Sequence, residues 1–181
     1  EVILLVLDAV DFLTEQDKRV AGIAHEAGKS VIILVNKWDL VEKDHRTVKE
    51  FQERIRFELG FLSYAPVLFV SAKTGQRVER ILSEVFQVAN EYTRRVSANQ
   101  LNQLLREAIS LHHPPSRKGK QLKLYYITQI KVKPPTFQLW VNDPKLMHFS
   151  YQRYLENRIR EDFGFTGSPL RFVLRKKTGE D

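Results

Sequence analysis

The chain has 181 residues, of which 43% are hydrophobic and 28% are charged, with a formal net charge of +7 and no cysteine. This composition is typical of a globular protein, and the length allows one domain or two small ones. Without cysteine there can be no disulfides or thiolate metal sites within these residues, and no apolar run approaches the roughly 20 residues that a membrane-spanning helix needs. We therefore expect a cytoplasmic protein with no membrane partner.

The first half alternates predicted strands and helices. Three apolar runs are typical of strands buried on both faces, and each is followed by apolar residues at helical spacing. The predicted strands cover residues 2–7, 31–35 and 66–70, and the predicted helices cover residues 14–27, 46–59 and 77–95. The βαβαβα order predicts a parallel sheet with right-handed crossovers, whose ligands bind beyond the carboxyl ends of the strands.

Helical spacing also predicts which side chains of two helices face this sheet. In the first helix they are Val20, Ile23, Ala24 and Ala27. In the third helix they are Val78, Ile81, Leu82, Val85, Phe86 and Ala89.

Two polar stretches follow neighbouring strands of the predicted sheet. Asn36-Lys37-Trp38-Asp39 comes after the second strand, and Ser71-Ala72-Lys73-Thr74-Gly75 comes after the third, 35 residues later. Each stretch alone could be an ordinary strand-end turn. Together they resemble the NKxD motif and the second base-contacting loop of the Ras-like GTPases, which implies binding of GTP and GDP.

Asp39 is the residue that this resemblance makes responsible for base selection. Guanine presents a pair of donors, N1–H and the 2-amino group, which one carboxylate can accept together. Adenine lacks that pair and would leave the carboxylate unpaired, which gives strong discrimination. Trp38 occupies the variable position of the motif and is expected to pack in the core. Asp8, at the end of the first strand, is expected to cap its loop.

The resemblance assigns supporting roles to five further residues. Asn36 would brace the two loops, and the Ser71 hydroxyl would tie its own loop together. The stem of Lys37 would cover one face of the base and Lys73 the other. The backbone N–H of Ala72 would donate to guanine O6.

The phosphate-binding parts of a GTPase are not found in the sequence. It contains no G-x-x-x-x-G-K-[ST] motif and no D-x-x-G turn for magnesium. The chain begins at Glu1, without Met, inside a predicted strand, so we expect it to be the tail of a longer protein. The Mg²⁺ ligands are expected N-terminal to that strand. Because hydrolysis depends on these groups, we expect no catalytic residue here and no activity from these 181 residues alone.

The second half carries the whole basic excess. Residues 1–96 contain 14 Lys and Arg against 15 Asp and Glu, whereas residues 97–181 contain 15 against 7, a net charge of +8. Such asymmetry suggests a nucleic-acid partner. A capping box opens a predicted helix at Ser97. The boundary is placed there, giving domains at 1–96 and 97–181.

The second domain is predicted to have the order αββαβ. Two strands at 124–132 and 136–142 are followed by a helix at 151–163 and a strand at 170–175. This small α+β arrangement resembles a KH domain, although the GxxG loop that clamps RNA in KH domains is missing. The basic loop with Arg117, Lys118 and Lys120 is the candidate RNA contact. A spacer or protein-docking module is the alternative, and His112 and His113 are interpreted as solvated loop residues.

The combination resembles the Der (EngA) family of bacterial GTPases, which carry two G domains in tandem. The stretch from Glu15 to Asp39 is similar to the second G domain of that family, and residues 133–165 are similar to its C-terminal module. The resemblance implies a factor for assembly of the large (50S) ribosomal subunit. Its partners would be ribosomal RNA and the protein's own first GTPase domain. The alternative is a non-enzymatic RNA- or protein-binding module with an inert G-like scaffold.

Overall fold

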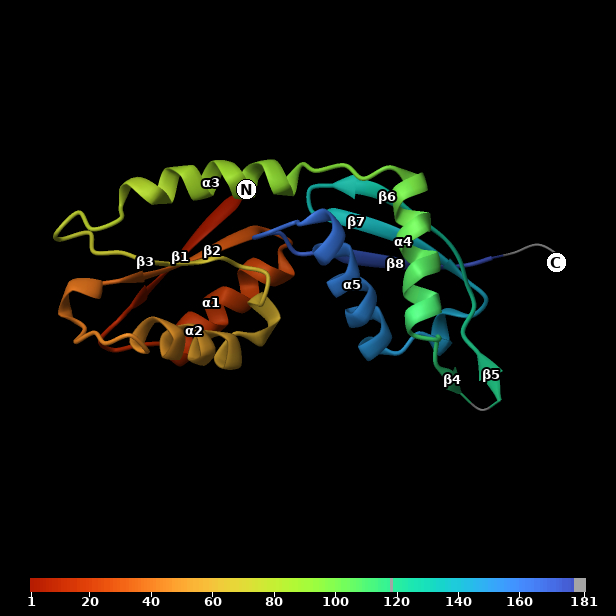
Figure 1. The fold of residues 1–181 in the computed structure, drawn as a ribbon, viewed down its shortest axis with the longest axis horizontal. Helices are drawn as coiled ribbons and strands as arrows, with labels where there is room; N and C mark the ends of the chain where they lie inside the picture. Colours follow the sequence, from red (N-terminus) through yellow and green to blue (C-terminus); the bar gives the residue numbers. More distant parts are fainter. Residues whose placement is uncertain (118, 178–181) are drawn as a thin grey trace. The chain divides into compact units, whose positions relative to one another are not determined.

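The computed structural model describes residues 1–117 and 119–177, which form two compact units (Figure 1). The first unit consists of Glu1–Tyr92 together with Phe165–Pro169, and the second of the described residues of 93–164 and 170–177. Within the described ranges, no helix has the length and apolar character needed to cross a bilayer.

The first unit is built around a parallel sheet in the order β1-β2-β3. Its strands are β1 (Val2–Asp8), β2 (Ser30–Asn36) and β3 (Val67–Phe69). Its α-helices are α1 (Glu15–Glu26), α2 (Thr47–Glu58) and α3 (Glu79–Tyr92), and two short 3₁₀ turns are η1 (Trp38–Leu40) and η2 (Gly60–Leu62). The predicted parallel α/β architecture is confirmed.

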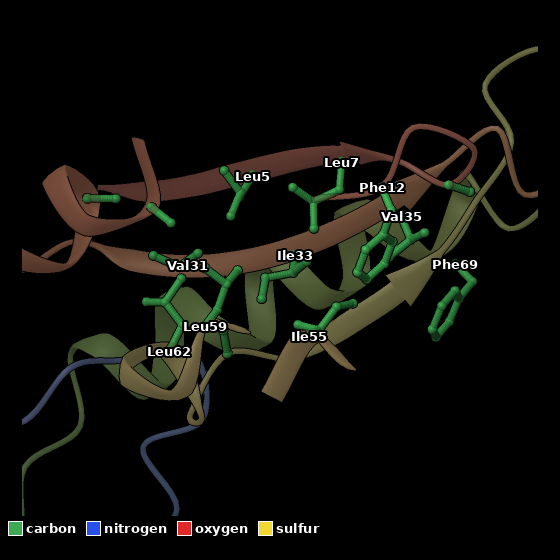
Figure 2. Packing of buried hydrophobic residues seen from close by; sticks show 14 of the residues in the cluster. Leu5, Leu7, Phe12, Val31, Ile33, Val35, Ile55, Leu59, Leu62 and Phe69 are labelled. Carbon is green, nitrogen blue, oxygen red and sulfur yellow. The ribbon is translucent and has the colours of Figure 1, made fainter. Parts of the chain in front are cut away.

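Helices cover both faces of this sheet (Figure 1). On one face α1 and α2 pack against alternate residues of β1 and β2. Figure 2 shows Leu5, Leu7 and Ile33 of these strands in one cluster with Ile55 and Leu59. On the other face α3 packs against Ile32 and Leu34. β2 is therefore buried on both sides, which explains its continuous apolar run.

The buried face of two helices differs in part from the face predicted by helical spacing. In α1 and at its C-cap, the predicted Val20, Ile23 and Ala27 are exposed, whereas Ala24 is buried as predicted and Ala21 is buried as well. In α3, three of the residues predicted to face the sheet are exposed, whereas two predicted residues, Ile81 and Val85, pack toward it together with two that were not predicted. The exposed residues are Val78, Leu82 and Phe86, and those packed inward are Ile81, Val85, Val88 and Tyr92. The apolar arc of each helix is wider than the sheet contact, so periodicity alone cannot fix its orientation.

The segment Phe165–Pro169, between α5 and β8, belongs to the first unit although it is distant in sequence. The carbonyl of Gly167 accepts a hydrogen bond from the Val31 N–H at 2.8 Å, and its N–H donates to the Tyr64 carbonyl at 2.8 Å. The buried hydroxyls of Ser30 and Ser168 lie 3.1 Å apart. These polar groups are satisfied inside the unit, so the segment completes the end of the sheet at which β2 begins.

The second unit has an α4-β6-β7-α5-β8 core with a mixed sheet in the order β6-β7-β8. Its helices are α4 (Ala98–Leu111), α5 (Phe149–Phe163) and the 3₁₀ turn η3 (Pro144–Leu146). Its strands are β6 (Leu124–Val132), β7 (Pro135–Val141) and β8 (Arg171–Lys176), with a small hairpin of β4 (Ser116–Arg117) and β5 (Lys120–Gln121). β6 and β7 pair antiparallel, and β7 and β8 pair parallel. The predicted αββαβ order is confirmed.

The apolar residues that alternate along β7 lie in the core of the second unit, and the buried residue of β6 is Ile127. Phe137, Leu139 and Val141 on β7 are fully buried, and α4 begins with the predicted capping box at Ser97 and Gln100. The basic loop contains the β4-β5 hairpin. Lys118 of the candidate RNA contact lies outside the described residues.

A substitution at Gly167 tests the packing of the segment Phe165–Pro169. Gly167 has φ +73°, and a Cβ there would lie 2.6 Å from a methyl carbon of Val88. Because backbone strain and overpacking both act, Gly167→Ala should lower the free energy of unfolding by about 1–3 kcal/mol in chemical denaturation. Gly22→Ala, a helical site where a Cβ has open space, is the control and should raise stability by up to about 1 kcal/mol. Equal behaviour of the two variants would contradict this packing.

Candidate functional site

Three strand ends meet at one edge of the first unit's sheet. The register pairs Asp8 with Asn36 across β1 and β2, and Val35 with Phe69 across β2 and β3. The loops that follow β2 and β3 therefore leave the sheet side by side. This is the edge at which ligands of parallel α/β sheets bind.

Asn36 joins the two loops directly. Its side-chain oxygen accepts a hydrogen bond from the backbone N–H of Ala72 at 3.0 Å. This is the bracing contact expected for Asn36. The same N–H is the one assigned to guanine O6, so in this structure it already has an acceptor. The contact between the Ala72 N–H and guanine O6 stays a prediction. It requires this N–H to donate to Asn36 and the base together, or to the base instead of Asn36.

Trp38 anchors the first loop in the core, as predicted. Its side chain is only 1% exposed, and its ring lies 4.5 Å from that of Phe69 and 5.1 Å from that of Phe51, measured between centroids. Its N–H donates to the Val70 carbonyl at 3.1 Å. Because the ring and the backbone are both fixed, the next residue, Asp39, has a defined position.

Asp39 presents an acceptor that no described residue satisfies. Its Oδ1 atom is buried and has no hydrogen-bond donor. Hydrogen bonding from Ser71, supported by the charges of Lys73 and Lys43, lowers the pKa of Asp39 below the ordinary 3.8. The carboxylate is therefore ionised at neutral pH. A buried ionised oxygen without a donor is costly, so the site favours a ligand that brings N–H groups to it.

Lys37 is held by an ion pair that the sequence does not predict. The residue adopts a left-handed conformation with φ 60°, and its ammonium pairs with the Asp8 carboxylate. That carboxylate also accepts hydrogen bonds from the N–H groups of Val10 at 2.8 Å and Asp11 at 3.4 Å, which is the predicted loop cap. The hydrogen bond from Lys37 and these N–H groups lower the pKa of Asp8. The only signal in the sequence is that Asp8 ends the strand beside Asn36.

The second loop is closed by its own serine. Ser71 is fully buried, its hydroxyl accepts the Thr74 N–H at 3.1 Å, and its own N–H donates to the Gln76 carbonyl at 3.1 Å. Lys73, at the tip of this closed loop, is exposed. The six predicted site residues are thus brought together by two adjoining loops.

Two family models match the chain, one for each half. A GTP-binding domain model of elongation factor Tu matches residues 1–91, and the C-terminal KH-domain-like model of EngA bacterial GTPase enzymes matches residues 95–175. GTPase Der of Alkaliphilus oremlandii is 58% identical over 181 residues. GTPase Der of Pelotomaculum thermopropionicum is 58% identical over 180 residues. The chain belongs to the Der (EngA) family of GTPases.

The alignments with these Der proteins cover 100% and 99% of this chain but 41% of each relative, so the chain spans about two fifths of their length. A crystal structure of Era in complex with MgGDPNP and nucleotides 1506-1542 of 16S ribosomal RNA is a weaker match, with 17% identity and a TM-score of 0.43. It covers 99% of this chain and 66% of that one. At this TM-score the match supports no inference.

The lowered pKa of Asp39 is open to direct measurement. Ser71→Ala removes the hydrogen bond that is its first cause, so the pKa of Asp39 should rise toward 3.8 in a carbon-detected NMR titration. Because the native pKa is depressed, ionised Asp39 stabilises the fold above pH of about 3.8 and loses that effect as the pH falls through the native value. Asp44, whose low pKa comes from the Arg46 and Thr47 groups, is the internal control and should not change. An unchanged pKa of Asp39 in Ser71→Ala would show that Ser71 does not donate a hydrogen bond to this carboxylate.

Proposed function

We propose that the chain binds GTP and GDP through the two adjoining loops and that the protein of which these residues are part hydrolyses GTP. The carrying observation is the buried Oδ1 atom of Asp39, an ionised acceptor that no described residue satisfies. Guanine offers two adjacent N–H donors to such a carboxylate. The closed Ser71 loop and the Asn36 brace support the proposal, because they hold the site in shape before the base arrives.

Within this proposal, the chain supplies base recognition and not hydrolysis. The described residues contain no group of three or more His, Asp or Glu side chains that could hold a metal ion. Mg²⁺ would neutralise phosphate charge in the reaction, and we propose that its ligands lie outside these 181 residues. The residues described here would then exclude adenine, orient the base and fix the nucleotide's position.

We further propose that the protein acts in the bacterial cytoplasm in assembly of the large ribosomal subunit, with the second unit bound to ribosomal RNA. Membership of the Der family supports this role. The net charge of +8 on residues 97–181 supports a nucleic-acid partner. The protein's own first GTPase domain is the proposed intramolecular partner.

Exchange of the base-selecting carboxylate tests nucleotide recognition in the complete protein. Asp39→Asn replaces one acceptor oxygen by an amide donor, which suits the 2-oxo group of xanthine and not the 2-amino group of guanine. Competition binding should show a loss of GDP affinity of roughly 10- to 100-fold and a gain for xanthosine diphosphate. The control is Glu42→Gln, which removes one negative charge from an exposed residue three positions away and should leave both affinities unchanged. Retention of guanine selectivity by Asp39→Asn would refute the assignment and favour an inert scaffold.

Neutralising the basic loop tests the RNA partner. The candidate contacts are Arg117 and Lys120, which are exposed, and Lys118, so a change of all three to Ala should alter stability by no more than about 0.5 kcal/mol per site. Binding to large ribosomal subunits should weaken. The slope of log affinity against log salt should fall by the amount that corresponds to up to about 3 phosphate contacts. If the wild-type affinity did not depend on salt, the second unit would bind protein rather than RNA.

A further inference from the structure

Two adjoining hollows lie beside the start of α5 in the second unit. One has a volume of about 410 Å³ and the other about 280 Å³, and Pro115 and His148 line both, so they form one groove. We call it the α5 groove. Its side-chain lining includes Arg117, Lys145, His112, His113, His148 and Tyr154. Its size is in the range of sites that hold a nucleotide-sized ligand.

The lining of the α5 groove is cationic. None of the described residues that line it is an Asp or Glu. Arg117 and Lys145 are exposed, and neither forms an ion pair with any described residue. The nearby Asp143 carboxylate already accepts the Lys145 N–H at 3.0 Å, where it caps η3. The groove therefore offers two free cations to an anionic ligand such as a phosphodiester.

The other wall of the groove is made of aromatic rings that are already fixed. The Tyr154 hydroxyl donates to the Ala108 carbonyl at 3.0 Å, and the Tyr151 hydroxyl donates to the His112 carbonyl at 2.9 Å. The Tyr154 ring lies 5.2 Å from the ring of His112 and 5.5 Å from that of Tyr151. These rings need little reordering to receive a planar ligand.

Phe149 places an exposed ring against His148, which lines the groove. It is the first residue of α5 and is 72% exposed, and its ring lies 4.4 Å from that of His148, which lines both hollows. The Nδ1 atom of His148 accepts the Ser150 N–H at 3.3 Å, so a neutral ring carries its proton on Nε2 and has a donor to offer. An exposed aromatic ring beside unpaired cations is the combination that binds unstacked bases.

We propose that the α5 groove binds a single-stranded segment of RNA, with Arg117 and Lys145 on its phosphates and Phe149 stacked on a base. This inference rests on the proposed RNA-binding function and names its site and its substrate class. A duplex keeps its bases stacked internally and would leave the Phe149 ring without a partner. Because any base can stack on a ring, the groove binds with little sequence preference.

The test uses the complete protein and a fluorescent ten-nucleotide RNA of mixed sequence, either single-stranded or annealed to its complement, in anisotropy titrations. The wild type should prefer the single strand. Phe149→Ala should weaken single-strand binding by about 5- to 100-fold without changing the salt dependence, because a stack releases no counterions. Phe149→Trp should retain binding, and the base stacked on it should quench the new tryptophan's fluorescence.

The double change Arg117→Gln, Lys145→Gln should instead reduce the slope of log affinity against log salt by about 1.4, or about 0.7 per contact. The matched controls are Lys123→Gln with Lys131→Gln, which remove the same charge from exposed sites of the same unit, and Phe57→Ala, which removes an exposed ring of the first unit. Both controls should bind as the wild type does.

The outcomes separate the two proposals. Wild-type protein that binds neither form of this RNA overturns the α5 groove, and absence of binding to large ribosomal subunits as well overturns the RNA-binding function. If the wild type favours the duplex, or if affinity falls equally in the groove variants and in their controls, the α5 groove is overturned and the RNA-binding function stands. Loss of binding by Phe149→Ala and not by Phe57→Ala, with rescue by Phe149→Trp, supports the groove.

Discussion

The parallel register of β1, β2 and β3 is the constraint from which the site follows. Because parallel strands end at the same edge, Asp8, Asn36 and the loop at Ser71 meet there although they are far apart in sequence. The Asn36 side chain then needs only one hydrogen bond, to the Ala72 N–H, to join the loops. The Trp38 side chain is buried in the core next to this edge, and its burial fixes the position of the next residue, Asp39.

The polar groups of the site divide into those already satisfied and one that is left for a ligand. Asp8 and Lys37 pair with each other, and Ser71 closes its own loop. The Oδ1 atom of Asp39 alone among the described site residues is buried without a donor. A base that brings no donor to Oδ1 leaves this charged acceptor unpaired in the complex, and that missing hydrogen bond is what allows the site to discriminate between bases.

Local sequence patterns were sufficient for the order of the main elements, because strand ends, caps and buried runs are local properties. The site residues were assigned by a family resemblance, and the structure brings them together at two adjoining loops. They failed where tertiary contacts decide. Val20 and Leu82 lie on apolar arcs wider than the sheet can cover, so their exposure depends on the angle at which each helix packs. The place of Gly167 in the first unit depends on hydrogen bonds to residues far away in the chain. The α5 groove likewise needs His112, Lys145 and Tyr154 to converge, which no spacing predicts.

A crystal structure of the complete protein with GDP bound tests the base assignment most directly. We expect Asp39 Oδ1 to lie about 2.7–3.2 Å from N1 or from the 2-amino nitrogen of guanine, with the Lys37 stem against the ring. A GDP whose base lies away from the loops at Asp39 and Ser71, or whose donors leave Oδ1 of Asp39 unpaired, would contradict it.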